Sequence, residues 1–389
     1  MKKGWTYKKI KEVGEVIGGT TPSTSNPAYW GGDICWISPA ELHGEHYLYD
    51  SVKKITKEAV AAKSLKQLPI GTVILSSRAP IGKIAINKIP MYCNQGFKCV
   101  VCGPELYNEY LYWWFYGKKD YLNSLGTGAT FPEISKTVVE NIAIPIPSLP
   151  EQQRIVKRLD AAFAHIDELK ANAEKQLAEV QALFQRSLTE EMKPKEGWEE
   201  KKLGEVTSFQ NGFAFKSNLF RSKGNPIVRI SNIQNEEIDT KGIVYFNKKD
   251  YDVNFDGFRI FPNDILIAMS GGTTGKIGIN KTDITFYQNQ RVGVIREDVK
   301  KLNHRFLYYF LHTKSEESLK IAAGAAQPNL STAQIKDFLI PLPPLPTQQR
   351  IVERLDALST RVKELEEIQR KTIAECDTLK QAILREVFE

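Results

Sequence analysis

Two long stretches of the chain place apolar residues at alternating steps of four and three positions. The first follows Pro150, and neither stretch contains Gly or Pro. This spacing is typical of the seam of a coiled coil, and about 40 helical residues span about 60 Å. The predicted seam is Ile155, Leu159, Ala162, Ile166, Leu169, Ala173, Gln176, Val180, Leu183 and Ser187 in the first stretch, and Ile351, Leu355, Leu358, Val362, Leu365, Gln369, Thr372, Cys376, Leu379 and Ile383 in the second.

Two arrangements of these helices are compatible with the pattern. Each could lie alone on its own domain, or the two could pair with each other. A seam this narrow and long favours a partner helix over a domain surface. Antiparallel pairing fits the chain order, because the first helix leads into the second domain and the second helix follows that domain. The polar seam residues Gln176 and Thr372 could fix the register or face an outside partner.

The chain is an internal repeat. Residues 145–162 read PIPSLPEQQRIVKRLDAA and residues 341–358 read PLPPLPTQQRIVERLDAL, with thirteen of eighteen positions identical. Weaker matches at slightly shifted offsets continue upstream, as loop insertions and deletions produce. A unit of about 195 residues is too long for a solenoid repeat. Each copy is therefore a domain followed by a long helix.

The segments before each helix are β-rich, with short apolar runs separated by Gly and Pro. Dense aromatic stretches at 107–116 and 304–312 predict helices of the domain cores. The expected divisions are residues 1–150, 151–191, 192–346 and 347–389. The sequence thus predicts an α+β fold: two mixed, β-rich domains separated by two long helices in an antiparallel coiled coil, an internal tandem repeat with pseudo-twofold symmetry.

Charge distinguishes the domains from the helices. Residues 1–150 carry 17 Lys+Arg against 12 Asp+Glu, and residues 192–346 carry 22 against 17. Residues 151–191 carry 6 against 8, and residues 347–389 carry 8 against 9. Basic domains suit a polyanionic partner such as DNA, although such an excess is also common on ordinary surfaces. The absence of a long apolar run argues against a membrane partner, and five cysteines favour reduced thiols in the cytoplasm.

The motifs for catalysis or cofactor binding that the sequence suggests are incomplete. The segment Ser270-Gly271-Gly272-Thr273-Thr274-Gly275-Lys276-Ile277 lacks the first Gly and the final Ser or Thr of a phosphate loop. Cys99 and Cys102 have metal-ligand spacing, but the second domain has no cysteine, so buried free thiols are expected rather than zinc. We therefore expect no cofactor on this chain and no enzymatic activity of its own.

The repeated PxPxLPxQQRIVxxLD pattern, together with Phe131-Pro132-Glu133-Ile134-Ser135, resembles the specificity (S) subunits of type I restriction–modification systems. The domain starts, Trp5 to Val16 with GGTTPS at 18–23 and Trp198 to Val206, are also similar to that family. The resemblance covers essentially the whole chain, and the domains match less well than the helix starts.

The resemblance implies a function. Residues 1–150 and 192–346 would be target-recognition domains, each reading one half of a split target in double-stranded DNA. The helices would set the spacer and dock two modification (M) subunits, which carry S-adenosylmethionine and methylate adenine N6. Restriction (R) subunits, which use ATP and Mg, would join through M. Half-sites one duplex turn apart are separated by about 34 Å, a distance that a helix of about 60 Å can span.

Candidate DNA contacts come from equivalent loops of the two domains, because side chains at base edges read sequence while lysines and amides hold phosphates. Arg78, the only arginine in residues 1–150, is the best candidate for a guanine contact. The candidates are Ser77, Arg78, Lys83, Thr127 and Thr130 in the first domain, and Arg229, Ser270, Thr273, Thr274, Lys276 and Arg291 in the second.

Two other classes of function remain open from the residues alone. The chain could be a coiled-coil scaffold or adaptor whose domains bind protein, or a nuclease or methyltransferase with unrecognised motifs. The target sequence and the spacer length do not follow from the sequence.

Overall fold

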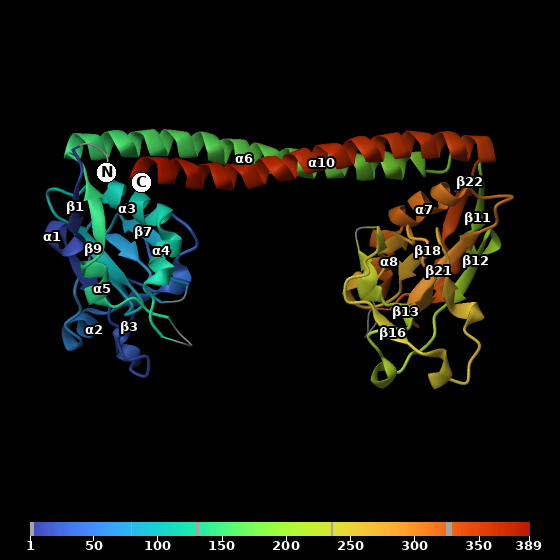
Figure 1. Cartoon of the computed structure of the whole chain (residues 1–389), viewed down its shortest axis with the longest axis horizontal. Helices are drawn as coiled ribbons and strands as arrows, with labels where there is room; N and C mark the ends of the chain where they lie inside the picture. Colours follow the sequence, from blue (N-terminus) through green and yellow to red (C-terminus); the bar gives the residue numbers. More distant parts are fainter. Residues whose placement is uncertain (1–3, 79, 129–131, 235, 324–328) are drawn as a thin grey trace. The chain divides into compact units, whose positions relative to one another are not determined.

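The computed structural model describes residues 4–78, 80–128, 132–234, 236–323 and 329–389 (Figure 1). The chain divides into two units, Met1–Glu174 with Arg370–Glu389, and Lys175–Gln369. Each unit combines one β-rich domain with a segment of each long helix, so the expected α+β class is confirmed. Within the described residues, no helix is long and apolar enough to cross a membrane.

The first domain contains a five-stranded sheet, a three-stranded sheet and a two-stranded ribbon. Its strands are β1 (Thr6–Lys9), β2 (Gly14–Gly18), β3 (Trp30–Ile37), β4 (Tyr47–Leu48), β5 (Lys54–Ile55), β6 (Val73–Leu75), β7 (Ile84–Asn87), β8 (Tyr92–Cys93), β9 (Lys98–Cys102) and β10 (Ala143–Ile146). Its short helices are α1 (Ile10–Val13), α2 (Lys57–Ala62), α3 (Asn108–Gly117), α4 (Lys119–Ser124) and α5 (Lys136–Glu140). The strand orders are β2-β9-β6-β7-β4, β5-β3-β8 and β1-β10.

The second domain repeats this plan with a six-stranded and a four-stranded sheet. Its strands are β11 (Glu199–Lys202), β12 (Thr207–Asn211), β13 (Asn225–Val228), β14 (Ile233–Gln234), β15 (Glu237–Ile238), β16 (Val244–Phe246), β17 (Arg259–Ile260), β18 (Ile265–Ala268), β19 (Ile277–Ile279), β20 (Phe286–Gln288), β21 (Val292–Glu297) and β22 (Leu339–Leu342). Its helices are α7 (His304–Thr313), α8 (Ser315–Ala323) and α9 (Thr332–Lys336). The orders β12-β21-β18-β19-β15-β14, β16-β13-β20-β17 and β11-β22 confirm the repeat, since β12-β21-β18-β19 corresponds to β2-β9-β6-β7.

The aromatic helices α3 and α7 belong to the cores, as predicted. Tyr110 and Phe115 of α3 are fully buried, and so is Phe306 of α7. The main core of each domain also takes in the start of a long helix: α6 (Leu149–Glu191) in the first and α10 (Leu345–Phe388) in the second. The domain and the helix that follows it are therefore one packed body.

Buried glutamines join each domain to its helix. The side chain of Gln152 accepts a hydrogen bond from the Tyr107 amide (2.8 Å) and donates to the carbonyls of Glu105 and Pro147 (both 2.9 Å). Gln348 makes the same three bonds at the equivalent places in the second domain. Both glutamines are fully buried, so this joint explains why the first glutamine of the QQR segment is the same in the two copies.

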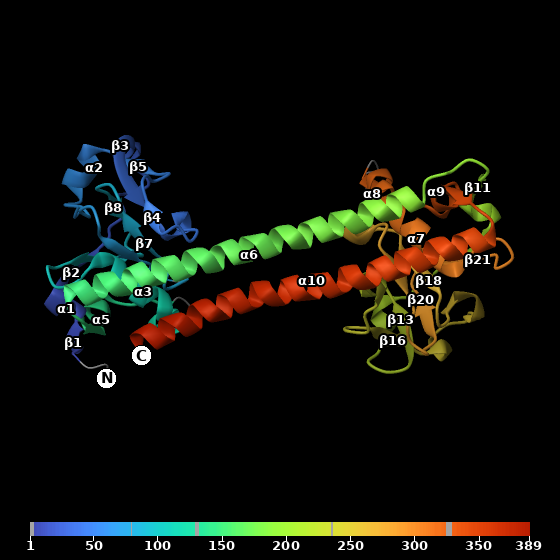
Figure 2. The same cartoon turned by 90° about the horizontal axis from the view of Figure 1, so that it is seen from above.

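Within each unit the segments of α6 and α10 run antiparallel and side by side (Figures 1 and 2). In the first unit Lys170 pairs with Asp377 at 2.8 Å, and Asp167 pairs with Lys380. In the second unit Gln176 bonds to Gln369 at 3.0 Å, and Glu191 pairs with Arg354 at 2.9 Å. In both units the residue number rises along one helix as it falls along the other, so the antiparallel pairing is confirmed.

The seam agrees with the predicted one at most positions and differs from it at four leucines. Ile155, Leu159, Ile166, Ile351, Leu355 and Val362 are buried, and Val180, Leu358 and Ile383 are half-buried. Leu169, Leu183, Leu365 and Leu379 are instead 52%, 49%, 44% and 49% exposed, so their assignment to the seam is wrong. The more buried positions next to these are Lys170, Phe184, Glu366 and Lys380.

A lysine explains the displacement at Leu379. The side chain of Lys380 is only 12% exposed, and its Nζ lies 5.0 Å from the ring centre of Phe163. A lysine can cover apolar surface with its methylenes while its ammonium reaches an acid, here Asp167. A count of apolar residues treats such a lysine as polar and selects the neighbouring leucine instead.

Candidate nucleic-acid interface

Loops from distant parts of the first domain meet at one place, which we call the first loop cluster (residues 19–21, 77–78, 94–98 and 132–134). The Ser77 amide donates to the Gly96 carbonyl and the Ile134 amide donates to the Ser77 carbonyl, both at 2.8 Å. The side-chain amide of Asn94 donates to the Thr21 hydroxyl at 2.9 Å. The cluster therefore brings together segments that are more than a hundred positions apart in the sequence, such as residues 19–21 and 132–134.

The second domain builds the same cluster from equivalent segments (residues 211–213, 269–276, 288–291 and 329–332). The Met269 amide donates to the Arg291 carbonyl at 2.9 Å, and the Leu330 amide donates to the Met269 carbonyl at 2.8 Å. The Thr332 hydroxyl and the Asn211 side chain lie 2.7 Å apart. The two domains thus share a scaffold at this site.

Glycines allow the backbone segments of each cluster to approach closely. A Cβ on Gly19 would lie 1.9 Å from the Asn94 carbonyl oxygen, and one on Gly212 would lie 2.0 Å from the Asn289 carbonyl oxygen. No larger residue fits at either position. The glycines of these equivalent positions are therefore explained by the architecture of the clusters.

Charged side chains of the first loop cluster form an ion network. Glu133 accepts hydrogen bonds from Nζ of Lys98 at 3.1 Å and from Nε of Arg78 at 2.9 Å. Burial favours the neutral form of Glu133, but the bonds from Lys98 and Arg78 outweigh this effect and hold its pKa below the ordinary value. The carboxylate is therefore charged at neutral pH.

The second loop cluster has a different set of charges. Arg291 is exposed, and its Nη1 donates to the side-chain oxygen of Asn329 at 3.2 Å. Lys276 is exposed and lies 3.3 Å from the side chain of Gln234. Because Asn329 is neutral, the charge of Arg291 is not compensated by this contact.

Several predicted DNA contacts are placed elsewhere by the structure. Ser77 is fully buried and accepts from Lys98, and Thr274 is 4% exposed and donates to the Gly271 carbonyl, so neither can contact DNA directly. Lys83 is committed to the carbonyls of Pro39 and Leu42, which makes it a structural residue. The prediction that Ser77, Lys83 and Thr274 contact DNA is therefore wrong.

The other candidates remain predictions. Thr130 lies outside the described residues. Arg78, Thr127, Lys276 and Arg291 are exposed, and Arg229, Ser270 and Thr273 are half-buried. Sequence reasoning did not assign Lys98, Glu133 or Asn329 to the site, although Glu133 lies in the FPEIS segment at 131–135 and Asn329 in its counterpart QPNLS at 327–331.

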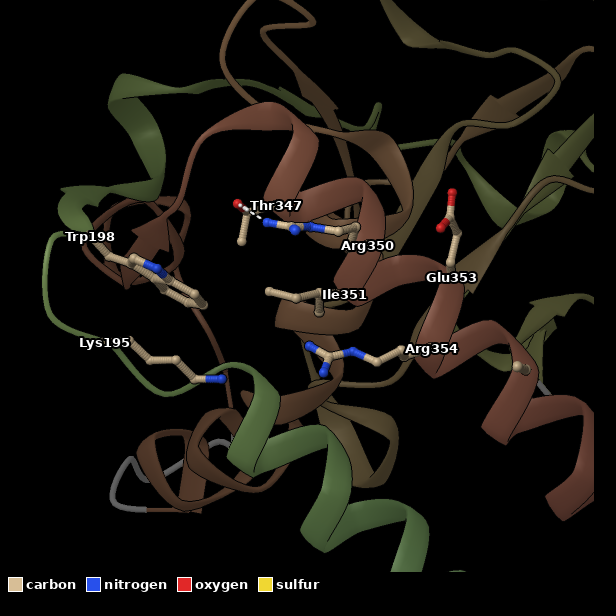
Figure 3. Close-up of a pocket in the computed structure, with 8 residues that line it drawn as sticks. Lys195, Trp198, Thr347, Arg350, Ile351, Glu353 and Arg354 are labelled. Carbon is tan, nitrogen blue, oxygen red and sulfur yellow. Dashed lines mark hydrogen bonds between the residues drawn. The ribbon is translucent and has the colours of Figure 1, made fainter.

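A separate pocket of about 610 Å³ lies at the start of α10 in the second unit. Figure 3 shows the cationic ends of Lys195, Arg350 and Arg354 directed toward the space beside Trp198. Glu191 pairs with Arg354 at 2.9 Å and with Lys195 at 3.5 Å, and Glu353 also lines the pocket, so the three cationic side chains outnumber the two acids. The pocket suits an anionic group.

Comparisons with known proteins agree with this architecture. Two segments, residues 2–179 and 195–375, match the family model of the type I restriction modification DNA specificity domain. The type I restriction enzyme MjaIX specificity subunit of Methanocaldococcus jannaschii is 32% identical over 395 residues, covering 92% of this chain and 88% of that protein.

Solved structures share the fold. One, from work on complex assembly and conformational transition of the type I R-M system, has a TM-score of 0.82 at 23% identity and covers 100% of this chain and 98% of its own. The HsdS subunit from Thermoanaerobacter tengcongensis has a TM-score of 0.63 at 22% identity, covering 100% and 97%. With the family model matched in both copies, the chain belongs to the specificity subunits of type I restriction–modification systems.

Proposed function

We propose that this chain is the DNA-reading subunit of a type I restriction–modification complex, in which each β-rich domain reads one half of a bipartite target. One observation carries the proposal: the same loop cluster is built twice on one scaffold, but with different side chains at equivalent positions. Strand register equates Arg78 with Ser270 and Glu133 with Asn329. A shared scaffold with divergent polar groups is what reading two different half-sites requires.

The paired helices would set the distance between the two half-sites and dock the modification subunits. Leu169 and Leu365 occupy equivalent positions of the repeat and are 52% and 44% exposed. Leu183 and Leu379 form a second equivalent pair, each 49% exposed. Each unit thus carries one exposed leucine from each of these two pairs on its helices, which suits one copy of the same apolar partner per unit. We assign these surfaces to two modification subunits, with the cationic pocket at Arg350 as an additional contact for an acidic group.

In this proposal the partner subunits catalyse the methylation and cleavage of DNA. We propose that this chain binds no cofactor itself and that S-adenosylmethionine, ATP and Mg bind to the modification and restriction subunits. The restriction subunits join through the modification subunits. The complex acts in the cytoplasm on double-stranded DNA.

Reciprocal arginine variants test the proposed function. Arg78→Ala is expected to weaken binding at the first half-site by about 5- to 150-fold, since one bidentate base contact is worth about 1–3 kcal/mol. Arg291→Ala should act in the same way on the second half-site only. Binding of the assembled complex to duplexes altered in one half at a time measures both effects. Equal losses at both halves from either variant would contradict the division of labour.

Helix variants test the docking surface. Leu169→Glu together with Leu365→Glu is expected to reduce co-purification of the modification subunit at least tenfold, because a carboxylate would be buried in an apolar contact. Ala178→Glu with Ala374→Glu is the matched control, since both alanines are exposed, equivalent in the repeat and about half a turn from the leucines. Undiminished co-purification of the leucine variant, with its helical content intact, would remove these residues from the interface.

A further inference from the structure

The ion network of the first loop cluster is absent from the equivalent places of the second. Lys98 and Gly293 are equivalent, because they pair with Gly18 and Asn211 at the ends of equivalent strands. Arg78 and Glu133 correspond by the same logic to Ser270 and Asn329. All three charged residues are thus replaced together by neutral ones. The network is therefore a property of the first domain and not of the shared scaffold.

Lys98 fixes the position of the Glu133 carboxylate. Its side chain is only 11% exposed, and Nζ donates to the Ser77 hydroxyl, the Gln95 carbonyl and Oε1 of Glu133 at 3.1–3.2 Å. An ammonium this buried requires a counter-charge. In the second domain the corresponding space is taken by Phe209, whose ring lies 2.4 Å from where a Cβ on Gly293 would be.

The second oxygen of Glu133 holds Arg78. Oε2 accepts from Nε of Arg78 at 2.9 Å, and the arginine side chain is 48% exposed. Among the described residues, Nη1 and Nη2 of Arg78 have no protein partner at hydrogen-bonding distance. A guanidinium held at Nε keeps both terminal nitrogens available for the O6 and N7 atoms of a guanine.

We propose that Glu133, fixed by Lys98, is a positioning residue that aims the guanidinium of Arg78 at one guanine of the half-site read by the first domain. The inference rests on the proposed function and adds to it the base read and the residue that orients the reader. Arg78 is the only arginine among residues 1–150, where lysines supply the remaining positive charge for phosphates. Because the guanidinium of Arg78 is held in place before binding, less rotamer entropy is lost on contact with DNA. Glu133 therefore contributes to the discrimination of guanine from other bases without touching DNA.

Selection from a randomised duplex pool tests the inference. The full chain, assembled with its partner subunits, is used as wild type and as Arg78→Ala, Arg78→Lys and Glu133→Gln. The wild type is expected to select a guanine at one position of the first half-site. Arg78→Ala and Arg78→Lys should make that position degenerate, and Glu133→Gln should reduce the guanine preference at least fivefold. Selection at the second half-site should be unchanged in every variant.

Base-analogue binding adds a readout that loss of folding alone would not change. Replacing the selected guanine by 7-deazaguanine should weaken wild-type binding by about 5- to 150-fold, because N7 is lost. The same replacement should cost Glu133→Gln less and Arg78→Ala nothing, and adding Glu133→Gln to Arg78→Ala should change this discrimination no further. Lys98→Met with Glu133→Gln removes both charges of the buried pair, so it protects the test against misfolding from an unpaired Lys98.

The possible results separate the inference from the proposed function. Full guanine preference in Glu133→Gln and in the Lys98→Met/Glu133→Gln variant would overturn the role of Glu133. A uniform loss of affinity in Arg78→Ala with unchanged base preference would assign Arg78 to a phosphate and overturn the inference, while the proposed function would stand. No selection by the wild type at either half-site would overturn the proposed function itself.

Discussion

Replacing Gln152 by leucine is expected to lower the free energy of unfolding of the first unit by about 3–9 kcal/mol. The substitution leaves the Tyr107 amide and the carbonyls of Glu105 and Pro147 without their partner, and each unpaired buried group costs about 1–3 kcal/mol. Denaturant unfolding followed by tryptophan fluorescence measures the effect. Of the six tryptophans, only Trp198 belongs to the second unit, so the signal reports mainly on the first.

The neighbouring residue supplies the control for this prediction. Gln153 is exposed, and Gln153→Leu should change the free energy of unfolding by less than about 0.5 kcal/mol. Gln348→Leu should reproduce the loss in the second unit, because its three hydrogen bonds are the same. An unfolding midpoint for Gln152→Leu equal to that of Gln153→Leu would show that the joint contributes little.

A four-residue insertion in α6 after Glu174 is expected to abolish recognition of the bipartite target. Four added residues shift one helix by about 6 Å against its partner and rotate it by about 40°. The contact of Lys170 with Asp377 in the first unit and that of Gln176 with Gln369 in the second then require different registers. Binding of the assembled complex to its target, together with co-purification of the partners, measures the loss.

Balanced insertions distinguish a spacer role from simple disruption. Seven residues added after Glu174 and seven added after Gln369 preserve the heptad phase of both helices. Each helix gains about 10 Å, which corresponds to about three base pairs of axial rise, so a pool with randomised spacers should yield a longer spacer. Recovery of the original spacer length would show that the helices do not set it.

The periodic pattern of the long helices predicted their pairing but not every residue of their contact. The four-and-three spacing predicted two long antiparallel helices, and the structure confirms them. It also predicted Leu169 and Leu365 in the seam, and these lie outside it. Two neighbouring stripes of one helix fit nearly the same spacing, and the choice between them depends on the partner surface, where the ammonium of Lys380 lies over the ring of Phe163.

The loop clusters could likewise be predicted from the sequence only in part. Equivalent loops could be identified from the repeat, but Ser77 and Arg78 are neighbours in sequence and one is buried while the other is exposed. The role of Glu133 depends on a lysine 35 positions away that enters from another strand. Pairwise contacts between segments this distant do not follow from spacing along the chain.

The sequence by itself determined the duplication, the two helices, the α+β class and the family, because these depend on local periodicity and on repeated motifs. Only the tertiary structure decided which helix face is paired, which polar side chains are buried and which charges meet. Those features depend on close packing between distant segments, where a shift of one residue or a single buried lysine changes which groups reach solvent.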